Sequence, residues 1–206
     1  LNADGRLDLF APGSLDPTSG IHNAVLLASP QTDAFSLAVT HPLAAVPGVN
    51  AAAWGDFDND GLTDVYLFRR GPNQLWQQTD AGRWEDVTSA SRTAGGAFNT
   101  VDGLFFDADH DGDLDIFVLE LNDLPTLLRN DGGNRNNYLL VRTEGTESNR
   151  DGIGARITVT AGDTSQIREV TAGASQMGQN MLEAHFGLGT ADIADSVTVR
   201  WPSGKV

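Results

Sequence analysis

Short apolar runs separated by polar turns set the pattern of residues 1–148. One set of runs directly follows aspartate-rich strings, at Leu9-Phe10, Val65–Phe68 and Ile116–Leu119. In each case a second run follows, and then a third: NAVLLAS (23–29), NQLWQQ (73–78), PTLLRN (125–130), then AFSLAVT (34–40), RWEDVT (83–88) and NYLLVRT (137–143). Such runs, bounded by Gly, Asn and Asp, predict short β-strands. The strings TDAG (79–82) and NDGG (130–133) predict hairpin turns.

The strands belong to an internal repeat. Asp-Gly pairs at Asp4, Asp60 and Asp111 lie 56 and 51 residues apart, and a further apolar run precedes the acidic string at Ala51 and again at Asp102. A period near 50 with about four strands per unit is typical of propeller blades. The sequence therefore predicts an all-β chain, with about three four-stranded β-propeller repeats over residues 1–148 and no long helix.

A different pattern begins near Asn149. GARITVTAG alternates apolar and polar residues and puts Ile157 and Val159 on one face, and QIREVTAG and DSVTVRW follow it. These runs predict a small separate β domain over residues 149–206. Because the chain starts inside an acidic string and stops after a Pro-Ser-Gly turn, we expect it to be a fragment of a longer protein, with this last domain truncated.

Two acidic strings carry the candidate chemistry: DFDNDGLTD (56–64) and DADHDGDLD (107–115). Aspartates at places 1, 3 and 5 of a tight loop can turn inward together, with a ninth-place aspartate closing the ring and a glycine at place 6 permitting the turn. The backbone carbonyl at place 7 can face the same centre. An all-oxygen set of this kind suits Ca²⁺ better than Mg²⁺. The predicted ligands are Asp56, Asp58, Asp60, Leu62, Asp64, Asp107, Asp109, Asp111, Asp113 and Asp115.

Two other structures could contain acidic strings of this kind. Solvated acidic turns are common, but two matching copies favour a metal. An EF-hand requires Glu at place 12 and flanking helices, whereas Leu67 and Val118 stand at that place and strands flank both loops. A third, incomplete string keeps Asn2, Asp4 and Asp8 but lacks its first place, so we expect it to bind metal weakly or not at all.

Composition narrows the range of partners. The net charge is −15, which argues against a nucleic acid or an anionic membrane surface, and no apolar run is long enough for membrane insertion. Cysteine is absent, so there is neither a disulfide framework nor a thiolate metal site. A hydrophobic content of 40% supports a packed core and excludes a disordered acidic tail.

The acidic strings and the strands after them resemble the FG-GAP/VCBS repeat of integrin-type β-propellers. NRDGIGARITVTAG, REVTAG, HFGLG and VTVRWPSG resemble the ASPIC/UnbV domain, and the ordered pair is similar to secreted proteins of the cartilage acidic protein 1 type and their bacterial relatives. The resemblance implies an extracellular or cell-surface location, with the periplasm as an alternative. It also implies a protein that binds structural Ca²⁺ and serves as an adhesion, matrix or partner-binding module without a catalytic centre. Three blades do not close a propeller, so either more blades lie upstream or the chain works inside an assembly.

The histidines and tryptophans bear on two further functions, catalysis and carbohydrate binding. His110 stands at place 4 of a loop and is expected to face solvent, whereas His185 is expected to pack within a strand, and no nucleophile elbow is found. We therefore expect no enzyme. The four tryptophans, Trp54, Trp76, Trp84 and Trp201, are expected to fill cores. If they were exposed they would suit sugar rings, which leaves a carbohydrate-binding or carbohydrate-processing protein as the alternative. The partner is thus a protein or a glycan.

Overall fold

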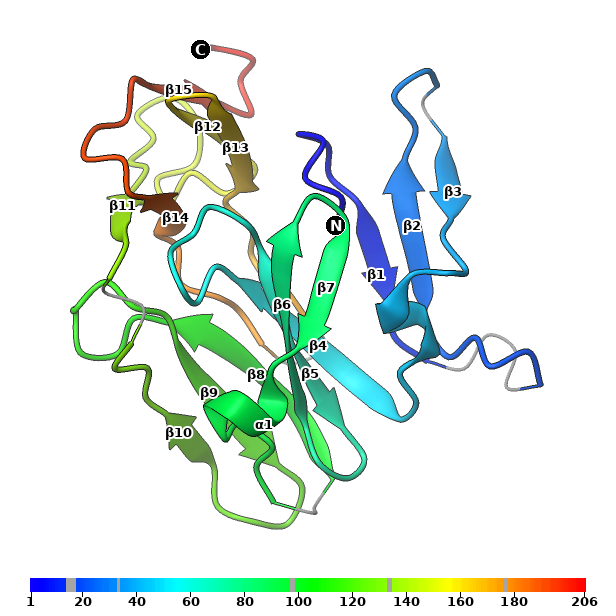
Figure 1. Ribbon diagram of the computed structural model, residues 1–206. Coiled ribbons are helices and arrows are strands. Elements are labelled where there is room, and N and C mark those ends of the chain that lie inside the picture. Colours follow the sequence, from blue (N-terminus) through cyan, green and yellow to red (C-terminus); the bar gives the residue numbers. More distant parts are fainter. Residues whose placement is uncertain (14–17, 33, 97–98, 133–134, 176–177) are drawn as a thin grey trace. The chain divides into compact units, whose positions relative to one another are not determined.

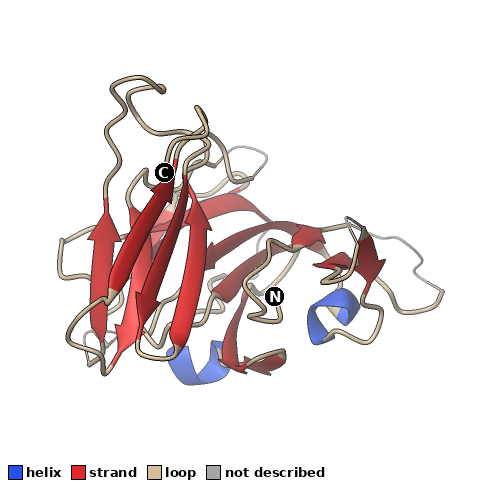
Figure 2. Cartoon of the chain, turned by 90° about the horizontal axis from the view of Figure 1, so that it is seen from above, coloured by secondary structure: helices blue, strands red, loops and turns tan. Residues whose placement is uncertain are grey.

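The computed structural model describes residues 1–13, 18–32, 34–96, 99–132, 135–175 and 178–206. Strands dominate these residues, and the two helical segments, the 3₁₀ turn η1 (Pro42–Ala45) and α1 (Thr88–Ser91), are short (Figure 2). The expectation of an almost entirely β chain is confirmed. Neither helical segment of the described residues has the length and apolar character that a membrane crossing requires.

The strands form separate sheets, and the first three sheets follow one another along the chain (Figure 1). The first sheet contains β1 (Leu9–Ala11), β2 (Ala24–Ala28) and β3 (Phe35–Leu37). The second contains β4 (Val49–Gly55), β5 (Asp64–Arg69), β6 (Gln74–Asp80) and β7 (Arg83–Asp86). The third contains β8 (Thr100–Phe106), β9 (Asp115–Glu120) and β10 (Thr126–Leu128). The second sheet thus has the four strands predicted for a repeat, whereas the first and third each have three.

Two compact units divide the chain, and their boundaries do not follow the sheets. The first comprises residues 1–54, 63–103 and 118–126, and the second comprises 55–62, 104–117 and 127–206. The second unit therefore contains most of the first acidic loop, all of the second and the C-terminal strands. The predicted domain boundary near residue 148 stays a prediction.

An apolar core holds the first unit together. Val25, Val65, Leu67 and Trp84 are buried in it, and Trp54 packs edge-on against Trp84 with ring centroids 6.2 Å apart. Trp76 also packs against this cluster, and Trp201 packs against the core of the second unit. All four tryptophans thus pack in or against a core, with Trp84 buried and the others partly buried, while a position between blades stays a prediction.

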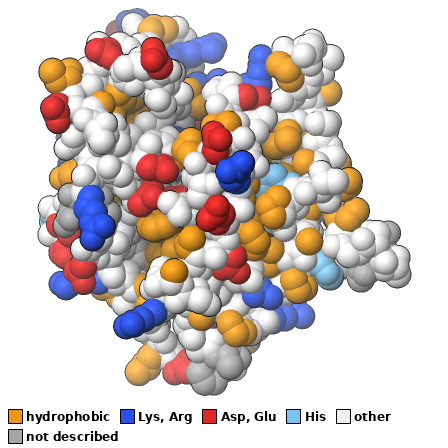
Figure 3. Space-filling view, in the orientation of Figure 1, with side chains coloured by type: hydrophobic (Ala, Val, Ile, Leu, Met, Phe, Trp, Pro, Cys, Tyr) orange, Lys and Arg blue, Asp and Glu red, His pale blue; other side chains and the backbone are white. Residues whose placement is uncertain are grey.

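The first sheet also has an exposed apolar face. Leu9 pairs with Leu26, which pairs with Leu37 on the third strand. Leu9, Phe35 and Leu37 are 49%, 48% and 47% exposed, and apolar side chains are visible over this sheet (Figure 3). The opposite face supplies Val25 to the core, so this sheet is apolar on both sides.

The C-terminal strands form two small sheets around a second core. One contains β13 (Thr164–Glu169), β12 (Arg156–Ala161) and β15 (Ser196–Arg200), and the other pairs β11 (Asn137–Val141) with β14 (Ala184–Gly189). Ile157 and Val159 are both buried, as the alternation predicts, and they pack with Phe186. This core is separate from the core of the repeats.

Strand β11 corrects one prediction. NYLLVRT was assigned to the third repeat, but β11 pairs with β14, from Val141 opposite Ala184 to Asn137 opposite Gly189. The reason lies in the segment before it. Asn130 and Asn136 donate side-chain hydrogen bonds to backbone carbonyls of the first acidic loop, so this segment is anchored there. Gly133 of the predicted NDGG turn lies outside the described residues.

Candidate metal-binding loops

Both acidic loops connect the first two strands of a repeat. Residues 56–64 join β4 to β5, and residues 107–115 join β8 to β9. The loops share a backbone conformation, with left-handed residues at place 4 (Asn59, φ 59°; His110, φ 62°) and place 6 (Gly61, φ 93°; Gly112, φ 92°). Asn tolerates this region, and glycine adopts it without strain. His110 is exposed, as predicted.

Backbone N–H groups hold the first-place carboxylates in position. The Asp107 oxygens accept hydrogen bonds from the N–H groups of Asp111 at 3.2 Å and Gly112 at 3.1 Å. The Asp56 oxygens accept the corresponding bonds from Asp60 at 3.1 Å and Gly61 at 2.9 Å. The repeated sequence therefore builds the same loop twice.

Three carboxylates converge in each loop. Asp107, Asp109 and Asp115 each offer an oxygen, and these oxygens lie within 4.8 Å of one another. Asp56, Asp58 and Asp64, which lie in one continuous stretch of chain, also each offer an oxygen within 4.8 Å of the other two. Two oxygens that bind one calcium at 2.3–2.6 Å are at most about 5.2 Å apart. Both carboxylate rings therefore fit a shared metal ion.

The remaining predicted ligands lie beside these rings. The fifth-place carboxylates accept hydrogen bonds from the N–H groups at place 7: Asp60 from Leu62 at 2.7 Å, and Asp111 from Asp113 at 3.0 Å. These bonds leave the second oxygen of each fifth-place carboxylate for another contact. Metal ligation by Asp60 and Asp111, and by the carbonyls of Leu62 and Asp113, stays a prediction.

The ninth-place aspartates connect the loops to the strands beyond. Asp115 Oδ1 accepts the N–H of Asn130 at 2.7 Å, and its Oδ2 accepts the N–H of Ala108 at 2.9 Å. Asp64 Oδ1 accepts the N–H of Gln78 at 2.8 Å. A ninth-place carboxylate thus joins its own loop to backbone within the next strand but one, at Gln78 in β6, or just after it, at Asn130 after β10.

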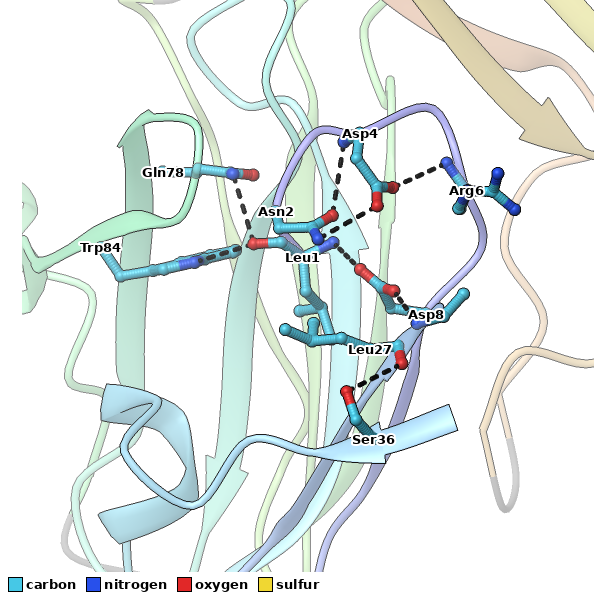
Figure 4. A network of polar contacts seen from close by, with 10 residues as sticks. Leu1, Asn2, Asp4, Arg6, Asp8, Leu27, Ser36, Gln78 and Trp84 are labelled. Carbon is cyan, nitrogen blue, oxygen red and sulfur yellow. Dashed lines mark hydrogen bonds and ion pairs between the residues drawn. The ribbon is translucent and has the colours of Figure 1, made fainter. Parts of the chain in front are cut away.

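The incomplete first string shares this local structure. Asp4 Oδ1 accepts the N–H of Arg6 at 3.0 Å, and Asp8 Oδ1 accepts the N–H of Ala28 at 2.8 Å. Asn2 and Asp4 contact each other, and the Leu1 amino group lies 2.7 Å from Asp8 Oδ2 (Figure 4). The string therefore makes the same local turn, and its weak metal binding stays a prediction.

Burial opposes ionisation of the carboxylates in the first loop. It raises the pKa of Asp56 to about 7, with Asp60 and Asp58 adding repulsion and Arg168 opposing the rise. It also raises the pKa of Asp60 to about 6, again with repulsion from Asp58. A bound cation would favour the ionised carboxylates and reverse these shifts.

Calcium affinity of the first loop should therefore fall as the pH falls. Asp56 and Asp60 have raised pKa values when folded, so in chelator they favour the folded state most at low pH, and that contribution is lost as the pH rises through about 6 to 7. Protons compete with calcium over the same range. Calcium titrations of an Asp115→Asn variant, which isolates the first loop, should give an affinity at least about 30-fold weaker at pH ~5.5 than at pH ~8. A constant affinity would contradict the buried, protonatable ring.

Sequence reasoning missed the residues that surround the loops. Asn130 donates from Nδ2 to the Phe57 carbonyl at 2.7 Å, and Asn136 donates to the Asp58 carbonyl at 2.9 Å. Gly187 also lies against the first loop. The available signal was the glycine inside the apolar run HFGLG, because a glycine within a strand often marks a close backbone approach.

Comparisons with known proteins agree with this architecture. The family model of the FG-GAP-like repeat matches residues 1–67 and again 56–118, and the family model described as ASPIC and UnbV matches residues 145–206. No curated protein gives a significant match to the chain. The two repeat matches contain the two complete acidic loops and together span more than half of the sequence. The chain therefore belongs to the FG-GAP-like repeat family and carries an ASPIC/UnbV domain after its repeats.

Proposed function

We propose that both complete loops bind Ca²⁺ and that the chain is a calcium-binding module for adhesion, matrix or partner binding, located outside the cell or at its surface, with the periplasm included. FG-GAP repeats indicate an adhesion or binding module of the β-propeller type, and the acidic rings can hold a metal ion. The observation that supports calcium most strongly is the recurrence of one ring geometry, with oxygens within 4.8 Å, in two successive repeats.

The choice of calcium follows from the ligand chemistry. Each ring offers carboxylate oxygens alone, and calcium accepts six to eight oxygen ligands, whereas magnesium demands octahedral geometry and keeps its waters. A bound calcium would neutralise the clustered carboxylates and hold them together. Because Asp64 accepts the N–H of Gln78 in β6 and Asp115 accepts that of Asn130 just after β10, the loops would then brace the repeats. This role is structural.

The proposal includes no catalytic role. His185 is 6% exposed and stacks on Tyr138, with ring centroids 5.9 Å apart, which is the packed position expected for a strand residue. The carbohydrate alternative depended on exposed tryptophans. Because Trp84 is buried and Trp54 and Trp76 pack against the same core, these side chains give that alternative no support.

Binding arrays test the proposed function. The whole chain would be applied to immobilised extracellular proteins and to glycans, in about 2 mM calcium and in chelator. An adhesion or partner-binding module predicts calcium-dependent binding to a defined protein, confirmed by a direct titration. Binding confined to glycans would favour the carbohydrate alternative. Binding to neither class, by a protein that takes up calcium, would contradict the partner-binding part of the proposal.

A further inference from the structure

Strand β14 of the C-terminal part rests directly on the first acidic loop. The Gly187 N–H donates to Asp56 Oδ2 at 3.1 Å, and this bond is buried. The Gly189 N–H donates to the Asn59 carbonyl at 2.8 Å. Two backbone donors of one strand therefore depend on the conformation of the loop, and one of their acceptors is a ring carboxylate.

The second loop contacts the same strand. His185 Nε2 lies 3.0 Å from the Gly112 carbonyl, which makes this nitrogen the donor. Tyr138 of β11 stacks on His185 with an interplanar angle of 7°. A Cβ atom on Gly112 would lie 1.9 Å from the Tyr138 ring, so the ring covers this glycine closely. Both loops thus contact β14, and we call the set of contacts made by Asp56, Asn59 and Gly112 the seat of β14.

Two amide side chains complete the seat. Asn59 Nδ2 donates to the Gly112 carbonyl at 3.3 Å and to Asp113 Oδ1 at 3.2 Å, which connects the first loop to the second. Gln166 Nε2 donates to the Gly187 carbonyl at 2.7 Å within the buried interior. A change in either loop therefore reaches β14 through several hydrogen bonds.

We propose that cation binding by the acidic loops and the seating of β14 on them are thermodynamically linked, so that the C-terminal part responds to the cation state of the repeats. This inference rests on the proposed calcium binding. A cation that fixes the ring also fixes Asp56 Oδ2 and the Asn59 carbonyl, the two acceptors that β14 requires. Linkage is reciprocal, so a firmly seated β14 raises the affinity of the loops for calcium by the same factor.

Hydrogen exchange on the full chain measures how calcium binding affects the packing of β14 on the loops. In about 2 mM calcium, the Gly187 and Gly189 amides should exchange at least about 10-fold more slowly than in chelator. The amides of Gly61 and Gly112, which donate to first-place carboxylates, report calcium binding by the loops themselves. Amides of the β2–β3 ladder in the first sheet, which contacts neither complete loop in the described hydrogen bonds, provide the reference and should change little.

A substitution outside the rings measures how the packing of β14 affects the affinity of the loops for calcium. Gln166→Ala removes the donor to the Gly187 carbonyl without changing a carboxylate, and it should weaken calcium binding at least about 5-fold. Gln179→Ala changes an exposed glutamine of the same unit and should leave the affinity unchanged. Equal affinities for the two variants would overturn the reciprocal effect.

The exchange pattern distinguishes the two proposals. Slower exchange at Gly61, Gly112, Gly187 and Gly189 together supports the linkage. Slower exchange at Gly61 and Gly112 alone would overturn the linkage and leave calcium binding intact. No change at any of the four amides would overturn both the linkage and the proposed calcium sites. The wild-type experiment keeps this test decisive even if Gln166→Ala fails to fold.

Discussion

Adding about 2 mM calcium to the chelated protein should raise its thermal unfolding midpoint by about 10 °C. Extracellular calcium modules bind with dissociation constants near 10⁻⁴–10⁻³ M. At about 0.1 mM affinity, each site contributes roughly 1.8 kcal/mol, and two sites contribute about 3.6 kcal/mol. In a chain of this size each kcal/mol moves the midpoint by about 2–4 °C. Calorimetry or circular dichroism would measure the shift.

Two controls define what this shift means. Magnesium at the same concentration should give a smaller shift, because it retains its own waters. Asp115→Asn removes one ring carboxylate and should reduce the calcium shift to about half, since the loop at residues 56–64 remains. An unchanged midpoint in the wild-type protein would contradict calcium stabilisation at both loops.

Gly187→Ala should destabilise the protein by about 3 kcal/mol, which lowers the midpoint by about 6–12 °C. A Cβ atom at this position would lie 2.1 Å from Asp56 Oδ2 and 2.5 Å from the Asn59 carbonyl carbon. Because one of these neighbours is backbone, the loop has to move as a whole. Overpacking costs typically about 1–3 kcal/mol, and the upper end applies where backbone is displaced.

A second glycine provides the matched control for Gly187→Ala. Gly132 has ordinary space for a Cβ, since the nearest heavy atom is Asn130 Oδ1 at 3.8 Å. Gly132→Ala should therefore stay within about 0.5 kcal/mol of the wild-type stability. Urea unfolding of both variants in calcium measures the difference. Equal stability of the two variants would show that β14 does not lie against the first loop.

The sequence was most informative about local features. The turn of each acidic loop was predictable, because the left-handed glycine at place 6 and the N–H groups that the first-place carboxylate accepts both lie within nine residues. Metal ligation by places 1 and 9 stays a prediction. The strands beside the loops were predictable for the same reason, since their apolar runs are short and clearly bounded. Alternation likewise predicted the buried face of Ile157 and Val159.

Longer-range pairing was less predictable. Nothing in NYLLVRT distinguishes a partner in the third repeat from one in the C-terminal part, because alternation specifies which face of a strand is apolar and not which strand it pairs with. The choice depends on Asn130 and Asn136, whose side chains bind loop carbonyls at 2.7 and 2.9 Å. The seat for β14 depends in the same way on Gly187 and Asn59, which are 128 residues apart in the sequence.

Isothermal titration of the chelated full chain with calcium tests the central claim most directly. The two carboxylate rings predict two calcium ions per chain for the wild-type protein. Asp115→Asn should retain one ion, and Asp123→Asn, which changes an exposed aspartate outside the loops, should retain both. No heat of binding and no saturable uptake by the wild-type protein would contradict the assignment of these loops as calcium sites.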